Sequence, residues 1–148
     1  MNDPHNLPSE GAEGGLARRQ VLHPRGWKPA RGYSNGVSVA PGRMIFLGGQ
    51  IGWNADQVFE TGDFVGQTRQ ALRNILAILA EAGGGPEHIV RLTWFVTSKK
   101  DYLADQRGLG AAYREVMGRS FPTMSVVEVT ALMEDEAKVE IEATAVIP

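Results

Sequence analysis

Hydrophobic and polar side chains alternate along residues 138–146, near the end of the chain. The apolar positions are Val139, Ile141, Ala143 and Ala145, and the polar positions between them are Glu140, Glu142 and Thr144. Because successive side chains of a strand point to opposite faces, this pattern predicts a strand with one buried face. We expect helices to cover the apolar face, and the acidic face to meet water or a partner subunit.

A helical period predicts two helices. The first follows Asp63, a suitable N-cap, and its repeating positions are Val65, Thr68, Leu72, Ile75, Leu76 and Leu79. It ends at Gly83-Gly84-Gly85-Pro86, since glycine accepts the left-handed cap and proline cannot continue a helix. The second spans about residues 101–117 and ends at Gly118.

Strand-like segments cover residues 19–22, 36–40, 44–49, 89–97, 124–129 and 138–146. Pro41-Gly42-Arg43 suits a hairpin turn between the second and third of these strands. In residues 89–97, one face is apolar and the other carries Phe95 beside Arg91 and two threonines, which indicates a subunit contact. The order of elements predicts an α+β fold, a mixed sheet with two helices on one face.

Composition limits the class of protein. Residues 1–16 are rich in glycine, proline and polar side chains and are expected to form a flexible arm, followed by a single domain over residues 17–148. A net charge of −2 and the lack of a long apolar run argue against nucleic acid and membrane partners. The chain has no cysteine, which excludes disulfides and thiol catalysis and fits a cytoplasmic protein.

Motifs for metal or phosphate binding are lacking. His5, His23 and His88 do not have metal-ligand spacing, and the glycine run follows a helix instead of leading into one. We therefore expect no metal site and no phosphate-binding loop.

Four segments in order resemble the RidA/YjgF family, also called the endoribonuclease L-PSP family. They are Phe46-Leu47-Gly48-Gly49-Gln50-Ile51, the helix from Gln67 to Leu79 with Asn74, Phe121-Pro122-Thr123-Met124-Ser125, and Lys138-Val139-Glu140-Ile141-Glu142-Ala143. The resemblance implies a chorismate-mutase-like fold, a homotrimer with a central barrel, and ligand pockets between subunits. Characterised members hydrolyse reactive enamines and imines to ketoacids and ammonia and need no metal or bound cofactor, so the resemblance implies no cofactor here.

The resemblance also implies site residues. Glu140 matches the family's acidic residue, a general acid or base, and Glu142 lies two residues further along the same face. The expected substrate-binding positions are Tyr33, Gly48, Gln50, Met124, Ser125, Val126 and Glu142. Gly48 and Val126 replace a serine and a frequent cysteine of the family.

Met124 is the main departure, because the family places a carboxylate-binding arginine there. A thioether cannot neutralise a carboxylate. Either Arg25, Arg31 or Arg91 binds the carboxylate instead, or the ligand has no carboxylate at this place. The second interpretation is favoured.

Three functions remain open: a hydrolytic deaminase with altered substrate preference, a trimer that binds a small metabolite without turnover, and a ribonuclease or translation inhibitor. The net charge argues against the last. A basic side chain that reaches the pocket from residues 25–31 would favour the enzyme. An apolar wall of Met124 with Trp27 or Trp53 would favour the binding protein, or an enzyme for a bulkier substrate.

Overall fold

The computed structural model describes residues 19–148, so the predicted arm over residues 1–16 lies outside the described residues. The elements in chain order are β1 (Arg19–Leu22), β2 (Gly36–Val39), β3 (Arg43–Ile51), α1 (Phe64–Glu81), the short 3-10 helix η1 (Pro86–His88), β4 (Ile89–Val96), α2 (Lys99–Ala104), α3 (Gln106–Met117), β5 (Thr123–Glu128) and β6 (Val139–Ile147). In this part of the chain no helix is long and apolar enough to cross a membrane.

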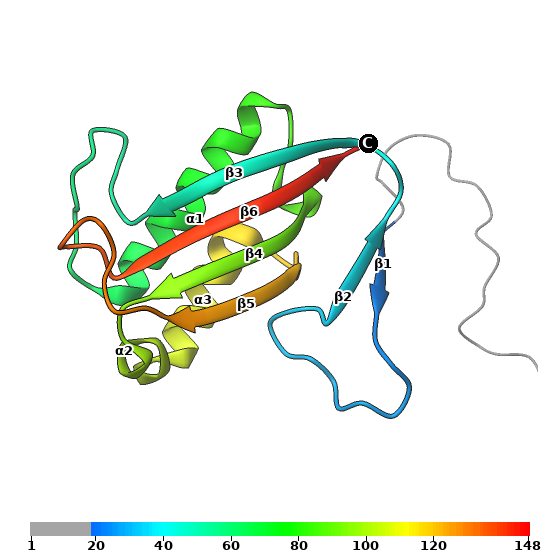
Figure 1. Cartoon of the computed structure of the whole chain (residues 1–148), viewed down its shortest axis with the longest axis horizontal. Helices are drawn as coiled ribbons and strands as arrows, with labels where there is room; N and C mark the ends of the chain where they lie inside the picture. Colours follow the sequence, from blue (N-terminus) through cyan, green and yellow to red (C-terminus); the bar gives the residue numbers. More distant parts are fainter. Residues whose placement is uncertain (1–18) are drawn as a thin grey trace, which may run out of the picture.

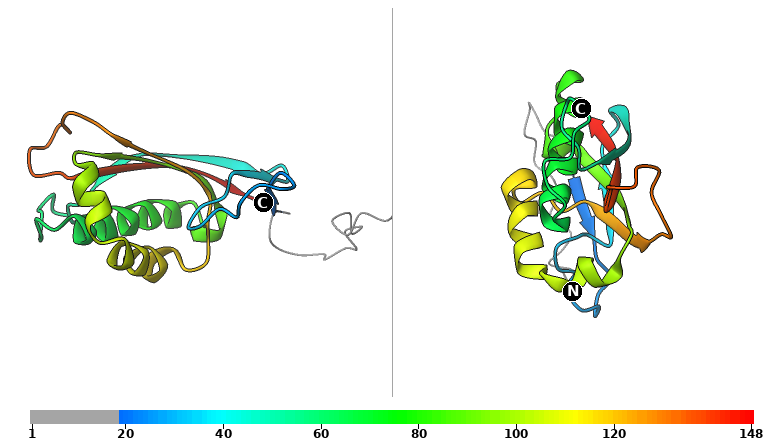
Figure 2. Two further views of the ribbon diagram at one scale, coloured as in Figure 1. Left: turned by 90° about the horizontal axis from the view of Figure 1, so that it is seen from below. Right: turned by 90° about the vertical axis from the view of Figure 1, so that its left-hand side faces the viewer.

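A four-stranded sheet with the order β3-β6-β4-β5 forms the centre of the fold. β4 and β5 run parallel, whereas β6 is antiparallel to both β3 and β4. The helices lie together on one face of this sheet, and the other face carries no helix (Figure 2). The α+β class and the mixed sheet are therefore confirmed.

The division of β6 into two faces is also as predicted. Val139, Ile141 and Ala145 are fully buried in the core beneath the helices. Glu142 is exposed on the opposite face, and Glu140 is half-buried there. Phe46 of β3 lies opposite Thr144 on this open face and is 74% exposed.

Helix α1 begins and ends where the sequence predicts. The Asp63 side chain accepts a hydrogen bond from the backbone N–H of Gly66 at 2.8 Å. After Ala82 the chain turns at Gly83, whose φ of 80° favours glycine, so the helix cannot extend. Leu72, Ile75 and Leu79 are completely buried.

The prediction of a single helix over residues 101–117 is wrong, because the structure has two helices there. Ser98 caps α2 by accepting from the N–H of Asp101, and Asp105 starts a new helix by accepting from the N–H of Gly108. The φ of Asp105 is −141°, which is not helical. A helical period alone does not reveal such a break, which lies in the non-helical backbone of Asp105 and the cap that its side chain forms. Residues 19–148 thus form three α-helices and not the predicted two.

The predicted hairpin between the second and third strands is also wrong. β2 pairs with β1 in a separate two-stranded sheet, and β3 pairs with β6 (Figure 1). The turn at Gly42 packs tightly on the end of β6, where a Cβ would come within 2.5 Å of the Ile147 carbonyl oxygen. The chain therefore leaves the β1–β2 sheet at this point and enters the main sheet.

Gln67 of α1 joins the helix layer to the start of β6. Its buried Nε2 donates to the carbonyl oxygens of Thr61 and Glu136, at 3.1 and 2.9 Å, and its Oε1 accepts from the N–H of Lys138 at 2.8 Å. This one amide satisfies three backbone groups from two loops. It holds the start of β6, and with it Glu140, against α1.

We expect Gln67→Leu to lower the free energy of unfolding by about 3 kcal/mol, because three backbone groups lose their partner at similar side-chain volume. Urea denaturation measures this change. Gln70→Leu is the matched control on the same helix, since its amide donates only to the Asn74 Oδ1 and is partly exposed. Equal losses in the two variants would contradict the role of Gln67.

Candidate functional site

A loop pairs with the start of the exposed edge of β5 and sets the position of Tyr33. Ser34 donates its N–H to the Pro122 carbonyl oxygen at 3.0 Å and its hydroxyl to the Phe121 carbonyl oxygen at 2.6 Å. Ser34 also forms an isolated bridge with Thr123, the first residue of β5. These bonds place the neighbouring Tyr33 beside Met124.

Two cavities meet at Tyr33 and Met124. One has a volume of about 200 Å³ and is also lined by Ser125 and Arg91. The other has a volume of about 230 Å³, extends toward α2 and α3, and is also lined by Arg31 and Arg114. The structure therefore brings together three of the predicted substrate-binding residues, Tyr33, Met124 and Ser125.

Side chains of β5 alternate between the two faces of the sheet. Met124 lies beside the buried Leu92, and Val126 beside the buried Trp94, so both face the helix layer. Ser125 lies beside Thr93 and faces the open side. Glu142 is opposite Thr93 on that same open side, where it is exposed.

Glu140 lies on the open face over a bulge of β3. The pairing of β3 with β6 shifts between Leu47 and Gln50, which leaves Gly48 and Gly49 in the irregular stretch. A Cβ on Gly49 would overlap the carboxylate of Glu140, so this position has room only for glycine while the carboxylate stays in place. The Gln50 amide donates to the Gly48 carbonyl oxygen at 3.4 Å.

The predicted residues thus form two groups that one chain does not bring together. Glu140 and Gly48 belong to β6 and β3 on the open face, whereas Met124 and Tyr33 lie at the β5 edge on the helix side. Within one protomer, the sheet separates Glu140 from the cavity of about 230 Å³ that extends toward α2 and α3.

Positive charge surrounds the two cavities. No carboxylate of the described residues lies within ion-pair distance of Arg31, Arg91 or Arg114. Burial raises the pKa of Tyr102 and of Tyr113 above the usual value of a phenol. Both phenols are therefore uncharged at neutral pH, and the Tyr113 hydroxyl donates to the Ser120 carbonyl oxygen at 2.6 Å.

The two candidate tryptophans do not line either cavity. Trp53 packs against Phe59 with a ring-centroid distance of 5.8 Å, and its carbonyl oxygen accepts from Asn74. Trp27 is 61% exposed in the loop between β1 and β2. The apolar wall of Met124 with Trp27 or Trp53 is therefore not formed in this chain.

Sequence reasoning missed Gly49, Arg114 and the aromatic side chains around Met124. Two successive glycines within a strand pattern are a signal for a bulge, and this signal was available. Arg114 carries no such signal, because its place next to the cavity depends on how α3 packs on the sheet.

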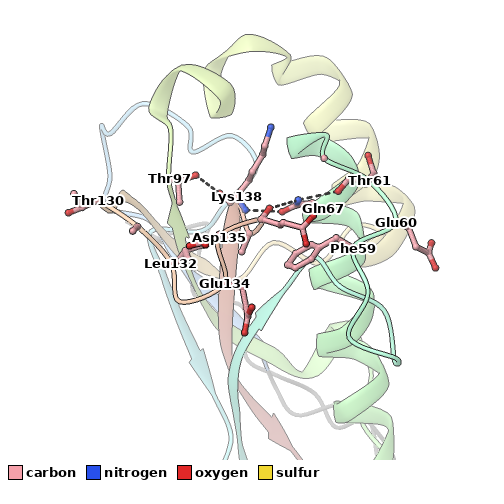
Figure 3. Close-up of a pocket in the computed structure, with 14 residues that line it drawn as sticks. Phe59, Glu60, Thr61, Gln67, Thr97, Thr130, Leu132, Glu134, Asp135 and Lys138 are labelled. Atoms are coloured by element: carbon pink, nitrogen blue, oxygen red, sulfur yellow. Dashed lines mark hydrogen bonds between the residues drawn. The ribbon is translucent and has the colours of Figure 1, made fainter.

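A larger cavity of about 600 Å³ lies at the other end of the sheet, between Gln67 and the loop before β6 (Figure 3). Its rim is acidic, with Glu60, Glu134 and Asp135, and it contains none of the predicted site residues. The polar atoms of the Gln67 amide are used by the backbone there. Residues 19–148 contain no cluster of histidines and carboxylates able to hold a metal ion.

Comparison with known proteins identifies the family. Residues 25–147 match the family described as endoribonuclease L-PSP. The chain belongs to the RidA/YjgF family. This assignment agrees with the resemblance of its four motifs.

Relatives within the RidA/YjgF family cover most of the chain. Protein DfrA of Myxococcus xanthus is 36% identical over 88% of this chain and 97% of its own length. The 2-iminobutanoate/2-iminopropanoate deaminase of Escherichia coli K12 is 38% identical over 77% of this chain and 86% of its own. The crystal structure of YyfB, a Rid family protein of unknown function from Yersinia pestis, superposes with a TM-score of 0.78 at 32% identity, over 87% of this chain and 98% of that chain.

We expect Gly49→Ala to move the Glu140 carboxylate off the bulge, because the carboxylate is the flexible end of its side chain and the backbone is not. Crystal structures of the variant and wild type measure this shift, and the free energy of unfolding should change by less than about 1 kcal/mol. Gly62→Ala is the control, since a Cβ there meets nothing within 4 Å. An unmoved carboxylate over a displaced β3 would contradict this view of the site.

Proposed function

We propose that the protein is a homotrimer that hydrolyses reactive imines or enamines, with each site formed by two subunits. The observation that carries the proposal is the separation of Glu140 from Tyr33 and Met124 by the sheet of one protomer. A second copy that covers the open face would bring its own Tyr33 and Met124 toward Glu140. The site is incomplete without that copy.

The reaction class is supported by the relative from Escherichia coli K12, a 2-iminobutanoate/2-iminopropanoate deaminase. In the proposed reaction, water adds to the imine carbon and forms the new C–O bond, while Glu140 accepts a proton from that water. Glu140 then returns the proton to the nitrogen. The hydroxyl proton of the resulting carbinolamine then moves to the nitrogen, the C=O bond forms as the C–N bond breaks, and the products are a ketoacid and ammonia. A carboxylate that exchanges a proton in this way contributes about 10²–10⁴ in rate.

Substrate preference is expected to differ from that of relatives with arginine in place of Met124. Arg31 from the loop after β1 lines the same cavity as Met124, and Arg91 lines the neighbouring one. A guanidinium there can bind a carboxylate in two parallel hydrogen bonds. Because a basic side chain from residues 25–31 reaches the candidate site, the enzyme is favoured over the binding protein.

The second candidate function is a trimer that binds a small metabolite without turnover. Val126 faces the helix layer beside Trp94, and Gly48 offers no side chain, so two positions that are polar in the family are apolar or empty here. We do not propose ribonuclease activity, despite the description of the family, because the net charge of −2 offers little attraction for RNA.

Light scattering at micromolar concentration should give the mass of a trimer. Phe46→Glu should dissociate it, since this side chain is 74% exposed on the open face and would place a charge in the interface. Met133→Glu is the matched control, because Met133 is 93% exposed in the loop before β6. A wild-type monomer would exclude the shared site.

The test of activity uses imines made in situ by an amino-acid oxidase, with ketoacid release as the readout. Wild type should accelerate release, and Glu140→Gln should lower the rate by about 100-fold or more, since an amide cannot accept the proton. Glu81→Gln, an exposed residue at the end of α1, is the control and should keep the wild-type rate.

Met124→Arg separates the two candidate functions. If wild type is inert and Met124→Arg hydrolyses imines, the protein has the scaffold of a deaminase with a site adapted to another ligand, and the binding function replaces the enzyme. If neither hydrolyses any imine, the proposed reaction is wrong.

A further inference from the structure

The cavity of about 230 Å³ beside Met124 has aromatic walls. It is lined by Trp94 of β4, Tyr102 of α2, Tyr113 of α3, and Phe121 before β5. Tyr102 meets Trp94 edge to face with a centroid distance of 6.4 Å, and Tyr113 stacks on Phe121 with a centroid distance of 5.9 Å. These paired rings support one another and leave a preformed space.

The size of this space suits an aromatic ring. An apolar cavity of about 150 Å³ is known to accommodate benzene, so about 230 Å³ holds a phenyl group with room for further atoms. Aromatic walls favour an aromatic guest, since ring faces and edges attract one another in stacked and edge-to-face arrangements. Gly110 of α3 also lines the cavity and leaves its space open, because it has no side chain.

The charge of the cavity suits an anion. Arg31 and Arg114 line it, its lining includes no acidic residue, and burial raises the pKa of the Tyr102 and Tyr113 phenols further above neutral pH. The indole Nε1 of Trp94 is buried without an acceptor among the described residues, so one hydrogen-bond donor of the wall is unused. The combination of aromatic walls and free guanidinium groups matches a ligand with a ring and a carboxylate.

We infer that the protein acts on 2-imino acids with an aromatic side chain, whose ring occupies this cavity and whose carboxylate binds Arg31 and Arg114. This inference rests on the proposed function and gives its substrate class. Met124 then forms an apolar wall for the ring, and the two arginines from the loop and α3 supply the charge that β5 lacks.

The experiment fills the cavity with a larger side chain on α3. Gly110→Leu places a side chain in it, and the nearest atom to a Cβ at this position is the mobile Nη1 of Arg114 at 3.3 Å, so the helix can accept the change. Leucine also favours a helix more than glycine does. The ratio of kcat/KM for the phenylalanine-derived imine to that for the alanine-derived imine should fall by about tenfold or more, the effect of a few methylene groups in an apolar pocket.

Arg114→Met should raise KM for the phenylalanine-derived imine by about tenfold, because a charge-assisted hydrogen bond to the carboxylate is lost. Arg107→Met is the matched control on the same helix, since Arg107 is exposed and does not line the cavity, and it should keep wild-type kinetics.

Binding of phenylpyruvate, the ketoacid of the aromatic substrate, is measured by calorimetry and does not depend on turnover. Wild type should bind it, and Gly110→Leu should not. If wild type hydrolyses small imines but does not bind phenylpyruvate, or if Gly110→Leu leaves the ratio unchanged, the inference is wrong and the proposed function stands.

If phenylpyruvate binds and Gly110→Leu abolishes binding while no imine is hydrolysed, the proposed reaction is wrong, and so is the inferred substrate class. The cavity is then a binding site for aromatic carboxylates. If there is neither binding nor hydrolysis, both proposals fail.

Discussion

The two-sided character of β6 is the constraint on which the rest of the structure depends. Its apolar residues, with Ile141 at their centre, hold the helices on one face of the sheet, so Glu140 must lie on the other. Because β6 is a central strand, the side chains of its neighbours β3 and β4 are divided between the same two faces of the sheet. The buried Gln67 amide holds the start of this strand by its bond to the Lys138 N–H. It thereby fixes where along β3 the Glu140 side chain contacts the bulge at Gly49.

The edge of β5 is the second place where structure and proposed function meet. An uncovered edge strand exposes unpaired backbone groups and invites association with other chains. Here the bonds of Ser34 to the carbonyl oxygens of Phe121 and Pro122 protect the start of this edge and also bring Tyr33 to Met124. The same loop carries Arg31. This loop therefore protects the start of the edge and forms part of the wall of both cavities.

Met124 on β5 carries no charge, and the guanidinium groups at this cavity come from other elements. A guanidinium on β5 would enter a space with buried aromatic walls, where its desolvation is costly. Arg31 and Arg114 reach that space from a loop and a helix and remain exposed. Their charge can thus stay hydrated until a ligand binds, while Met124 extends the apolar surface. An apolar interior with cationic groups at its margin is the usual design of a site for an amphipathic small molecule.

The sequence by itself determined the α+β class, the limits of α1 and the two faces of β6, because caps and side-chain periodicity act between residues close in the chain. The motifs around Gln50 and Glu140 also led to the family. Tertiary structure decided that β2 pairs with β1 and that Arg114 lies near Met124, because both features depend on contacts between separate segments. The break at Asp105 is a local cap, which the helical period of the sequence hides. The contacts between separate segments are stabilised by packing, which no pattern within one segment reveals.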